Sequence, residues 1–252
     1  MALLETENVT KEFGGLMALD AIDITIEEGE LVSLIGPNGA GKSTLINVIT
    51  GMMPPSAGSV RYDGTDIVGK KPHEIVQLGI GRSFQTAAIF SDLTVRENVD
   101  VASFMTEHGS FSLNFFRRRD RYDAVRERTE NILEVLGLDE EAELPANALP
   151  YGDTRRLEIA VGMATDPDLM FMDEPTAGMS PGETDMTTDL IRRMREEWGI
   201  TILLVEHDMD VVFDVSDRII TLHQGSVIAR GPPEEIRDDP RVRSAYLGGG
   251  GG

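Results

Sequence analysis

The sequence predicts an α/β protein built on a parallel β-sheet, with a block of helices inserted into it. Short apolar segments typical of buried strands occur at residues 31–36, 168–175 and 199–208, and a helical segment (182–198) lies between the last two. Strands that alternate with helices form parallel sheets with right-handed crossovers. From about residue 88 to 164 the pattern is instead helical and more charged, which indicates an inserted helical subdomain.

The flanking segments complete the predicted order of elements. Residues 3–10 and 22–30 are typical of strands, and residues 58–68 (GSVRYDGTDIV) of a hairpin arm. No internal repeat is visible, so we expect a single domain over residues 1–252. A C-terminal tail over about 226–252 ends in five glycines, and we expect its part from residue 231 onward to be flexible and without chemistry.

The composition is strongly acidic and poor in lysine. The 252 residues include 44 Asp and Glu against 23 Lys and Arg, which gives a net charge of −21, and only four of the basic residues are lysines. Such a negative field opposes non-specific binding to nucleic acid or anionic lipid. It favours a halophile-like acidic protein, since salt screens the self-repulsion. An acidic protein from a mesophile remains the alternative.

Other compositional features concern the compartment. The chain contains no cysteine, which excludes disulfides, thiol catalysis and cysteine-ligated metals and fits a reducing compartment. No apolar run approaches the ~18 residues of a membrane span. The N-terminus is acidic where a signal peptide would be basic. We therefore expect a cytoplasmic protein.

Residues 36–44 (GPNGAGKST) match the phosphate-binding pattern G-x-x-x-x-G-K-S/T. The motif follows an apolar strand and opens a helical segment, which is the context that it requires. Its glycines let backbone N–H groups converge on phosphate oxygens, Lys42 can reach the outer phosphates, and the Ser43 hydroxyl can ligate Mg²⁺. The motif predicts a nucleoside-triphosphate site made of Gly36, Pro37, Asn38, Gly39, Ala40, Gly41, Lys42, Ser43 and Thr44.

Two further strand ends carry groups suited to this site. A buried strand ends in Asp173 and Glu174, a costly arrangement unless the carboxylates serve a purpose. Behind a phosphate-binding loop, Asp173 can support Mg²⁺ through its water shell and Glu174 can polarise an attacking water. His207 ends the next apolar strand and can hydrogen-bond the γ-phosphate or that water. Gln85 carries a carbonyl oxygen that can ligate Mg²⁺ and sense the γ-phosphate.

Residues 148–164 (ALPYGDTRRLEIAVGMA) predict a helix with an elaborate start. The apolar stripe of this helix consists of Leu157, Ala160, Val161 and Ala164, at i, i+3, i+4 and i+7. Its start consists of Leu149, Pro150, Tyr151, Gly152 and Asp153.

Taken together, these motifs resemble those of the ATP-binding subunits of ABC transporters, over essentially the whole chain. In that family the order is Walker A (36–44), Q-loop (Gln85), signature loop (149–153), Walker B (169–174), D-loop (177–180) and H-loop (His207). The resemblance implies a RecA-like P-loop NTPase core with an antiparallel β subdomain and the inserted helical subdomain. It also implies ATP hydrolysis with Mg²⁺, and adenine stacking on Phe13.

The signature loop departs from the usual L-S-G-G-Q. In the family this helix N-terminus faces the γ-phosphate of ATP held by the opposite subunit. Here Pro150 replaces the serine, Tyr151 replaces the first glycine, and Asp153 brings a negative charge near a phosphate. We expect Arg155 and Arg156 to offset that charge. The loop should then dock mainly through Tyr151, Gly152 and backbone N–H groups.

The tyrosine, the following RRLEIA and the C-terminal EEIRDDPRVRSAYLG resemble one of the two ATPases of branched-chain amino-acid importers. The resemblance implies a heterodimer with a second ATPase, two transmembrane permeases, and indirectly a substrate-binding protein, at the cytoplasmic face of the membrane. Related ATPases for urea or amide uptake and for lipopolysaccharide export share the pattern. A soluble ABC ATPase acting on nucleic acid and a P-loop kinase fit less well.

Residues 104–123 lie in the long stretch before the signature loop. Phe111, Leu113, Phe115 and Phe116 precede three arginines there. Aromatic residues beside arginines can lie on a membrane face, but they can equally pack onto their own subdomain. The sequence leaves the role of this segment open.

Overall fold

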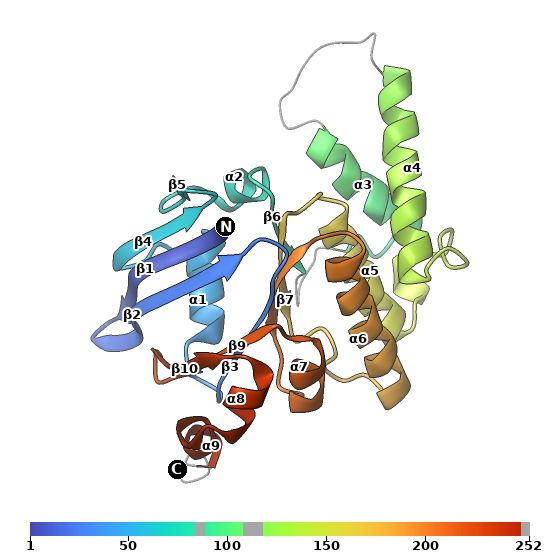
Figure 1. The fold of residues 1–252 in the computed structure, drawn as a ribbon. Coiled ribbons are helices and arrows are strands. Elements are labelled where there is room, and N and C mark those ends of the chain that lie inside the picture. The colour runs from blue at the N-terminus through green and yellow to red at the C-terminus, as the bar shows by residue number, and fades with distance from the viewer. Residues whose placement is uncertain (84–88, 108–117, 248–252) are drawn as a thin grey trace.

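A computed structural model describes residues 1–83, 89–107 and 118–247. Two β-sheets and a group of helices form the fold (Figure 1). The smaller, antiparallel sheet lies on one side of the molecule, and helices α3 and α4 project from the other (Figure 1). The larger, parallel sheet lies between them and positions the predicted site.

The smaller sheet has the strand order β2-β1-β4-β5 and begins with a long hairpin. The strands are β1 (Ala2–Phe13), β2 (Leu16–Glu27), β4 (Ala57–Tyr62) and β5 (Thr65–Asp66). Gly14 and Gly15 make the turn with positive φ. On β2, Ile22, Ile24 and Ile26 alternate with more exposed residues and face the core. This antiparallel sheet confirms the subdomain that the family resemblance implied.

The larger sheet has the order β10-β9-β3-β8-β7-β6. Strands β6 to β9 and β3 pair in parallel, and only β10 runs antiparallel to its neighbour. The strands are β3 (Leu31–Ile35), β6 (Ile80–Ser83), β7 (Leu169–Asp173), β8 (Thr201–Val205), β9 (Arg218–His223) and β10 (Ser226–Gly231). All of β3 and β8 is buried, because both faces of this sheet are covered. The predicted parallel sheet is confirmed.

Helices cover the two faces of the larger sheet and form two cores. One core packs α1 and the smaller sheet against the larger one and includes Phe171 and Leu203. The other lies beneath α3, α5 and α6 and includes Leu157, Met170 and Ile191. The helices are α1 (Lys42–Ile49), α2 (Pro72–Val76), α3 (Val95–Glu107), α4 (Arg118–Leu136), α5 (Tyr151–Met163), α6 (Pro181–Glu196), α7 (Met209–Val215), α8 (Pro233–Asp238) and α9 (Pro240–Leu247).

The stretch from 88 to 164 contains α3, α4 and α5, as its helical pattern predicts. The stripe on α5 is confirmed, since Leu157, Ala160 and Ala164 are fully buried and Val161 packs partly buried against the same core. Of residues 104–123, the part from 108 to 117 lies outside the described residues, and with it the aromatic cluster that precedes the arginines.

The C-terminal region is more ordered than the sequence suggests. Residues 226–247 form β10, α8 and α9, and Ala229, Ile236 and Val242 are buried in a third cluster with residues of β9 and α7. The expectation that the tail is flexible from residue 231 onward was therefore wrong for residues 231–247. The apolar side chains in this segment are widely spaced, so the sequence shows neither the hydrophobic period of an α-helix nor that of a β-strand. The terminal glycines 248–252 lie outside the described residues.

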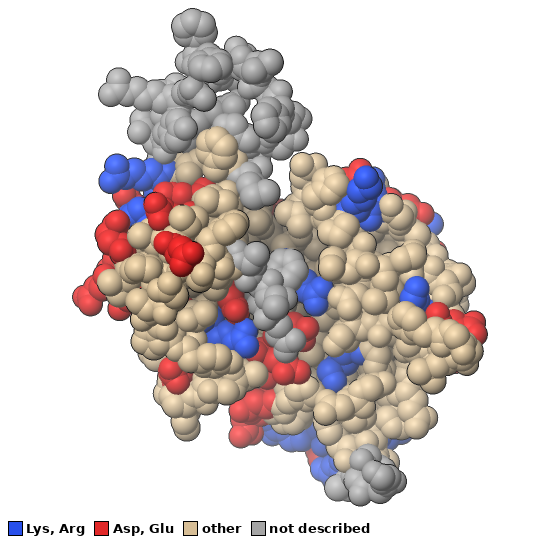
Figure 2. All heavy atoms as spheres, turned by 180° about the vertical axis from the view of Figure 1, so that it is seen from behind, with Lys and Arg blue, Asp and Glu red and all other residues tan. Residues whose placement is uncertain are grey.

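Acidic side chains gather on the lobe that carries α4, on the face shown in Figure 2. Glu127, Glu130 and Glu134 on this helix are exposed.

Among the described residues, no helix is long and apolar enough to cross a membrane.

Candidate nucleotide site

Three neighbouring strands bring the predicted site residues to one edge of the larger sheet. β3 leads into the loop at residues 36–41, β7 ends in Asp173 followed by Glu174, and β8 is followed by Glu206 and His207. In the sheet, β8 lies between β3 and β7, and all three are parallel. Their carboxyl ends therefore meet, which is where α/β sheets bind ligands.

The loop before α1 needs glycine at two close approaches. A β-carbon at Gly36 (φ +150°) would lie 2.1 Å from the backbone oxygen of Leu222, and one at Gly41 (φ +108°) would lie 2.8 Å from that of Ala18. A β-carbon at Gly39 (φ +78°) would meet no atom within 4 Å. The loop is thus fixed from behind by β9 and the start of β2, while its middle faces open space.

Lys42 opens α1 and is almost fully buried, with 7% of its surface exposed. Its Nζ donates to the backbone oxygens of Gly36 (2.6 Å) and Pro37 (3.3 Å). Burial lowers the pKa of this ammonium group, and the carboxylates of Glu174 and Asp173 only partly offset that effect. Ser43 next to it is exposed. The lysine is therefore a desolvated cation at the mouth of the loop, in an environment that an anion would stabilise.

Asp173, the last residue of β7, supplies the carboxylate predicted to support Mg²⁺. Burial raises the pKa of its carboxyl, and the guanidinium of Arg82 acts in the opposite direction. Arg82 Nη2 lies 3.7 Å from Asp173 Oδ2, and Arg82 Nη1 donates to Asn47 Oδ1 on α1 (2.9 Å). Sequence reasoning missed Arg82. Its position three residues before Gln85 gives no signal, because its contact with Asp173 joins two different strands.

Glu174 and His207 lie in contact. Nε2 of His207 is 2.9 Å from Oε1 of Glu174, and both side chains are partly exposed. Glu174 has φ +52°, and its backbone N–H donates to the oxygen of Val205 (2.7 Å). A non-glycine residue in this conformation is uncommon and is maintained only where the surrounding contacts fix it. The structure thus brings together the two residues predicted to carry catalysis.

The start of α5 lies beside the segment that follows Glu174. A β-carbon at Gly152 would lie 2.4 Å from Oε1 of Glu183 on α6, so a larger residue there would require the Glu183 side chain to move. Asp153 forms an ion pair with Arg156, as expected. Arg155 does not offset Asp153: it donates to Glu158 (2.6 Å) and to the Tyr151 hydroxyl. The expectation for Arg155 was wrong because Arg155 follows Asp153 by two residues, which places it about 200° around α5, on the other side of the helix.

The remaining predicted residues are Phe13, Leu149 and Gln85. Phe13, at the end of β1, is 47% exposed, so its ring is open to a planar partner, with Lys11 Nζ 5.1 Å from the ring centroid. Leu149 packs partly buried against the core below α5. Gln85 lies outside the described residues, so its proposed role remains a prediction.

The residues present fit a nucleoside triphosphate and a hard divalent cation. The open middle of the loop leaves room for phosphate oxygens, and the buried Lys42 ammonium suits their charge. Ser43 and Asp173 supply hydroxyl and carboxylate oxygens, the donors that Mg²⁺ prefers. Among the described residues, no group of three or more His, Asp or Glu side chains is arranged to hold a metal ion.

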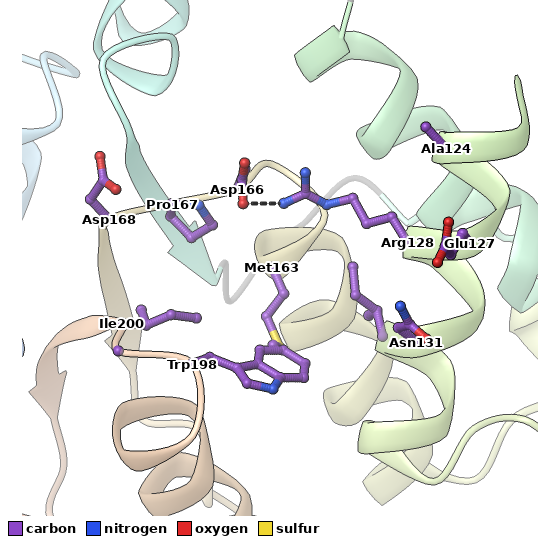
Figure 3. A pocket seen from close by; sticks show the side chains of 12 residues that line it. Ala124, Glu127, Arg128, Asn131, Met163, Asp166, Pro167, Asp168, Trp198 and Ile200 are labelled. Atoms are coloured by element: carbon purple, nitrogen blue, oxygen red, sulfur yellow. Dashed lines mark ion pairs between the residues drawn. The ribbon is translucent and has the colours of Figure 1, made fainter. Parts of the chain in front are cut away.

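A separate hollow of about 520 Å³ lies at the opposite, amino edge of the sheet (Figure 3). Arg128 reaches across it from α4 to Asp166, with 2.5 Å between Nη2 and Oδ1, and Trp198 lines its far side (Figure 3). Asp168 and Ile200 in its wall directly precede β7 and β8. The hollow is therefore distinct from the site that the sequence predicts.

Comparison with known proteins agrees with the family resemblance of the sequence motifs. The family profile described as "ABC transporter" matches residues 19–177, and that described as "Branched-chain amino acid ATP-binding cassette transporter" matches residues 226–251. The chain is 42% identical over 250 residues to the "High-affinity branched-chain amino acid transport ATP-binding protein BraF" of Pseudomonas aeruginosa, with 98% of each chain covered. It is 40% identical over 254 residues to LivG of Escherichia coli, which has the same description, again with 98% of each covered.

Solved structures of similar chains share the fold. A nucleotide-free ATP-binding cassette from an ABC transporter matches with a TM-score of 0.84 and 35% identity, over 98% of this chain and 99% of that one. The ADP conformation of MJ1267, an ATP-binding cassette of an ABC transporter, matches with a TM-score of 0.86 at the same identity and coverage. The dimeric MJ0796 cassette bound to ADP and Pi matches with a TM-score of 0.77 and 29% identity, over 91% and 98% of the two chains.

Proposed function

Because this chain belongs to the ABC transporter ATP-binding family and is an ATPase of that family, we propose that it drives a membrane importer for branched-chain or other hydrophobic amino acids. The observation that carries the proposal is identity of 40–42%, over nearly the full length, to ATP-binding proteins named for high-affinity branched-chain amino acid transport. The profile match at residues 226–251 adds independent support, since it lies outside the ATP-binding motifs.

In the proposed reaction, each residue acts from the position described above. Lys42 and the backbone N–H groups of residues 39–44 bind the phosphates, and Phe13 stacks on the adenine. Ser43 and Asp173, with Gln85, would hold Mg²⁺, which supplies positive charge at the phosphates when bound. Glu174 polarises the attacking water and accepts its proton, and His207 keeps the Glu174 carboxylate in place through the 2.9 Å contact.

The proposed assembly pairs this chain with a second ATPase. The start of α5 would close the partner's site with Tyr151, Gly152 and backbone N–H groups, while the partner closes this one. Two transmembrane permeases would hold the pair at the cytoplasmic face of the membrane, and a substrate-binding protein would deliver the solute. The acidic surface favours protein partners over nucleic acid.

A loop-repair experiment tests the heterodimer. Pro150→Ser with Asp153→Gln adds a hydroxyl donor and removes a charge at the start of α5, each worth about 1–2 kcal/mol of closure. In a Glu174→Gln background with ATP, the repaired chain should form homodimers more tightly in analytical ultracentrifugation. If the chain with its natural loop dimerises equally tightly, the loop is not weakened and the heterodimer proposal loses its physical support.

The solute is tested by uptake in cells. Deleting the gene should abolish high-affinity uptake of labelled leucine, isoleucine and valine. The wild-type gene should restore uptake, but a Glu174→Gln gene should not. Urea uptake serves as the control. Loss of urea uptake with normal leucine uptake would replace this proposal with the urea alternative.

A further inference from the structure

Glu206 is a buried carboxylate outside the predicted catalytic set. It is 3% exposed and lies between β8 and His207. Its Oε1 accepts hydrogen bonds from the backbone N–H of Thr176 (2.9 Å) and from the Thr176 hydroxyl (2.6 Å). Its Oε2 accepts from the backbone N–H of His207 (2.9 Å). Three donors thus compensate the burial of its charge.

These bonds fix both members of the catalytic pair. Thr176 follows Glu174 by two residues, and the N–H of Ala177 donates to the Glu174 oxygen (3.2 Å), so Glu174 and Thr176 belong to one tight turn. His207 contacts the Glu174 carboxylate directly. Glu206 therefore joins, through one side chain, the backbone on both sides of the Glu174–His207 contact.

Tyr151, at the first position of α5, contacts the other end of the same turn. Its hydroxyl donates to the backbone oxygen of Ala177 (2.9 Å). Arg155 donates to that hydroxyl from Nε (3.2 Å) and Nη2 (3.1 Å), which leaves the hydroxyl proton for Ala177. A β-carbon at Gly178 would lie 3.4 Å from the Tyr151 ring, so the ring also packs against the turn.

We propose that Tyr151 and Glu206 are positioning residues that link the start of α5 to the Glu174–His207 pair of the same chain. Tyr151 holds Ala177, the turn from Ala177 to Glu174 carries the constraint, and Glu206 transmits it to His207. In the assembly proposed above, on which this consequence rests, the start of α5 closes the partner's nucleotide site, so docking on one nucleotide orders the catalytic pair at the other. The inference concerns ATP hydrolysis and is independent of which solute is transported.

Hydrogen exchange on the full chain tests the link without a partner or a solute. Tyr151→Phe removes one hydroxyl and leaves the ring. It should raise the exchange rates of the Thr176 and His207 amides at least about threefold, because both depend on the turn staying closed. Tyr62→Phe is the matched control: its hydroxyl lies 3.4 Å from Gly79 O and Asp168 Oδ2, away from the site. Unchanged exchange at Thr176 and His207 in Tyr151→Phe would overturn the proposal.

Steady-state kinetics of the assembled ATPase tests the consequence. Glu206→Gln presents an NH₂ group where a carboxylate oxygen now accepts a bond, so it should lower kcat about 10- to 100-fold. The KM for ATP should stay within about twofold, because the phosphate-binding residues are untouched. If this variant does not fold, Thr176→Val removes only the 2.6 Å hydroxyl bond and should give a smaller change of the same kind.

The double variant separates linked from independent effects. If Tyr151 and Glu206 act along one path, Tyr151→Phe with Glu206→Gln should lower kcat no further than Glu206→Gln alone. If the double variant instead lowers kcat by the product of the two single effects, the two residues act independently and the inference is refuted. A rise in KM with kcat unchanged would refute it as well.

Discussion

Glu174 combines a strained backbone with a functional contact. Its φ of +52° lies in the left-handed region, which costs a non-glycine residue of the order of 1–3 kcal/mol. The conformation lets its N–H reach Val205 while its carboxylate meets His207. The surrounding bonds maintain a geometry that the isolated segment would not adopt, which is typical of residues held ready for chemistry.

Glu174→Gln should therefore retain ATP binding and lose hydrolysis. The amide keeps the side-chain shape but cannot accept the proton of the attacking water, so the rate should fall about 10²- to 10⁴-fold. Equilibrium ATP binding and phosphate release measure the two effects. Glu30→Gln, a carboxylate paired with Arg218 away from the site, is the control. Wild-type turnover in Glu174→Gln would exclude Glu174 as the base.

The glycines of the phosphate loop make a second prediction at the same scale. Gly36→Ala places a β-carbon 2.1 Å from Leu222 O, whereas Gly39→Ala meets nothing within 4 Å, and both residues have positive φ. Gly36→Ala should lower the free energy of unfolding by at least about 2 kcal/mol more than Gly39→Ala. Urea unfolding of the two variants measures the difference. Equal losses would mean that β9 does not hold the loop from behind.

At the scale of elements, one ion pair joins β9 to the turn between β2 and β3. Arg218 donates from Nε (2.6 Å) and Nη2 (2.9 Å) to Glu30, and from Nη2 to the backbone oxygen of Thr25 (2.5 Å). Burial alone would raise the pKa of the Glu30 carboxyl. The bonds from Arg218 and from the Glu27 N–H outweigh burial, so its pKa in the folded protein lies below the usual value. The pair therefore favours the charged, folded form.

This direction sets an acid dependence of stability. A carboxyl with a lowered pKa contributes stability above its unfolded pKa of about 4.3, and that contribution is lost as the pH falls through the folded value. Glu30→Gln should thus lower the melting temperature at pH 7. On acidification from pH 5 to 3, the melting temperature of this variant should fall less than that of the wild type. Melting curves across this range test it. Parallel curves for the two proteins would contradict the pKa direction.

For the whole molecule, charge is the dominant feature. A net charge of −21 on 252 residues creates repulsion that folding must overcome. Exposed ion pairs such as Arg126–Glu130 contribute little individually to offset this repulsion. In dilute buffer the Debye length reaches about 30 Å, so the repulsion acts across the protein, and at molar salt it shrinks to about 3 Å.

The melting temperature should therefore rise between about 0.01 M and 1 M KCl, the range over which screening changes most. Sucrose at matched osmolality controls for solvent exclusion from the surface. A melting temperature that stays flat or falls with KCl would remove the argument for a halophile-like protein. A rise with sucrose as large as that with KCl would assign the effect to exclusion instead of charge.

The sequence by itself determined the fold class, and it predicted the principal site residues. Residues 36–44 carry a local pattern, and Asp173, Glu174 and His207 each end an apolar strand. Because the carboxyl ends of parallel strands meet, their order along the chain was enough to bring them together. The same local logic failed for β10, α8 and α9, whose apolar residues are too sparse to show a period.

Only the tertiary structure decided which side chains support the site. Tyr151 contacts Ala177 across 26 residues, and Glu206 contacts Thr176 across 30. Arg82 meets Asp173 from the neighbouring strand. No sequence spacing or motif connects these residues with the ones that they contact. Hydrogen bonds and burial depend on distance in space, which the sequence does not show. A buried carboxylate such as Glu206 becomes recognisable only when its three donors are seen around it.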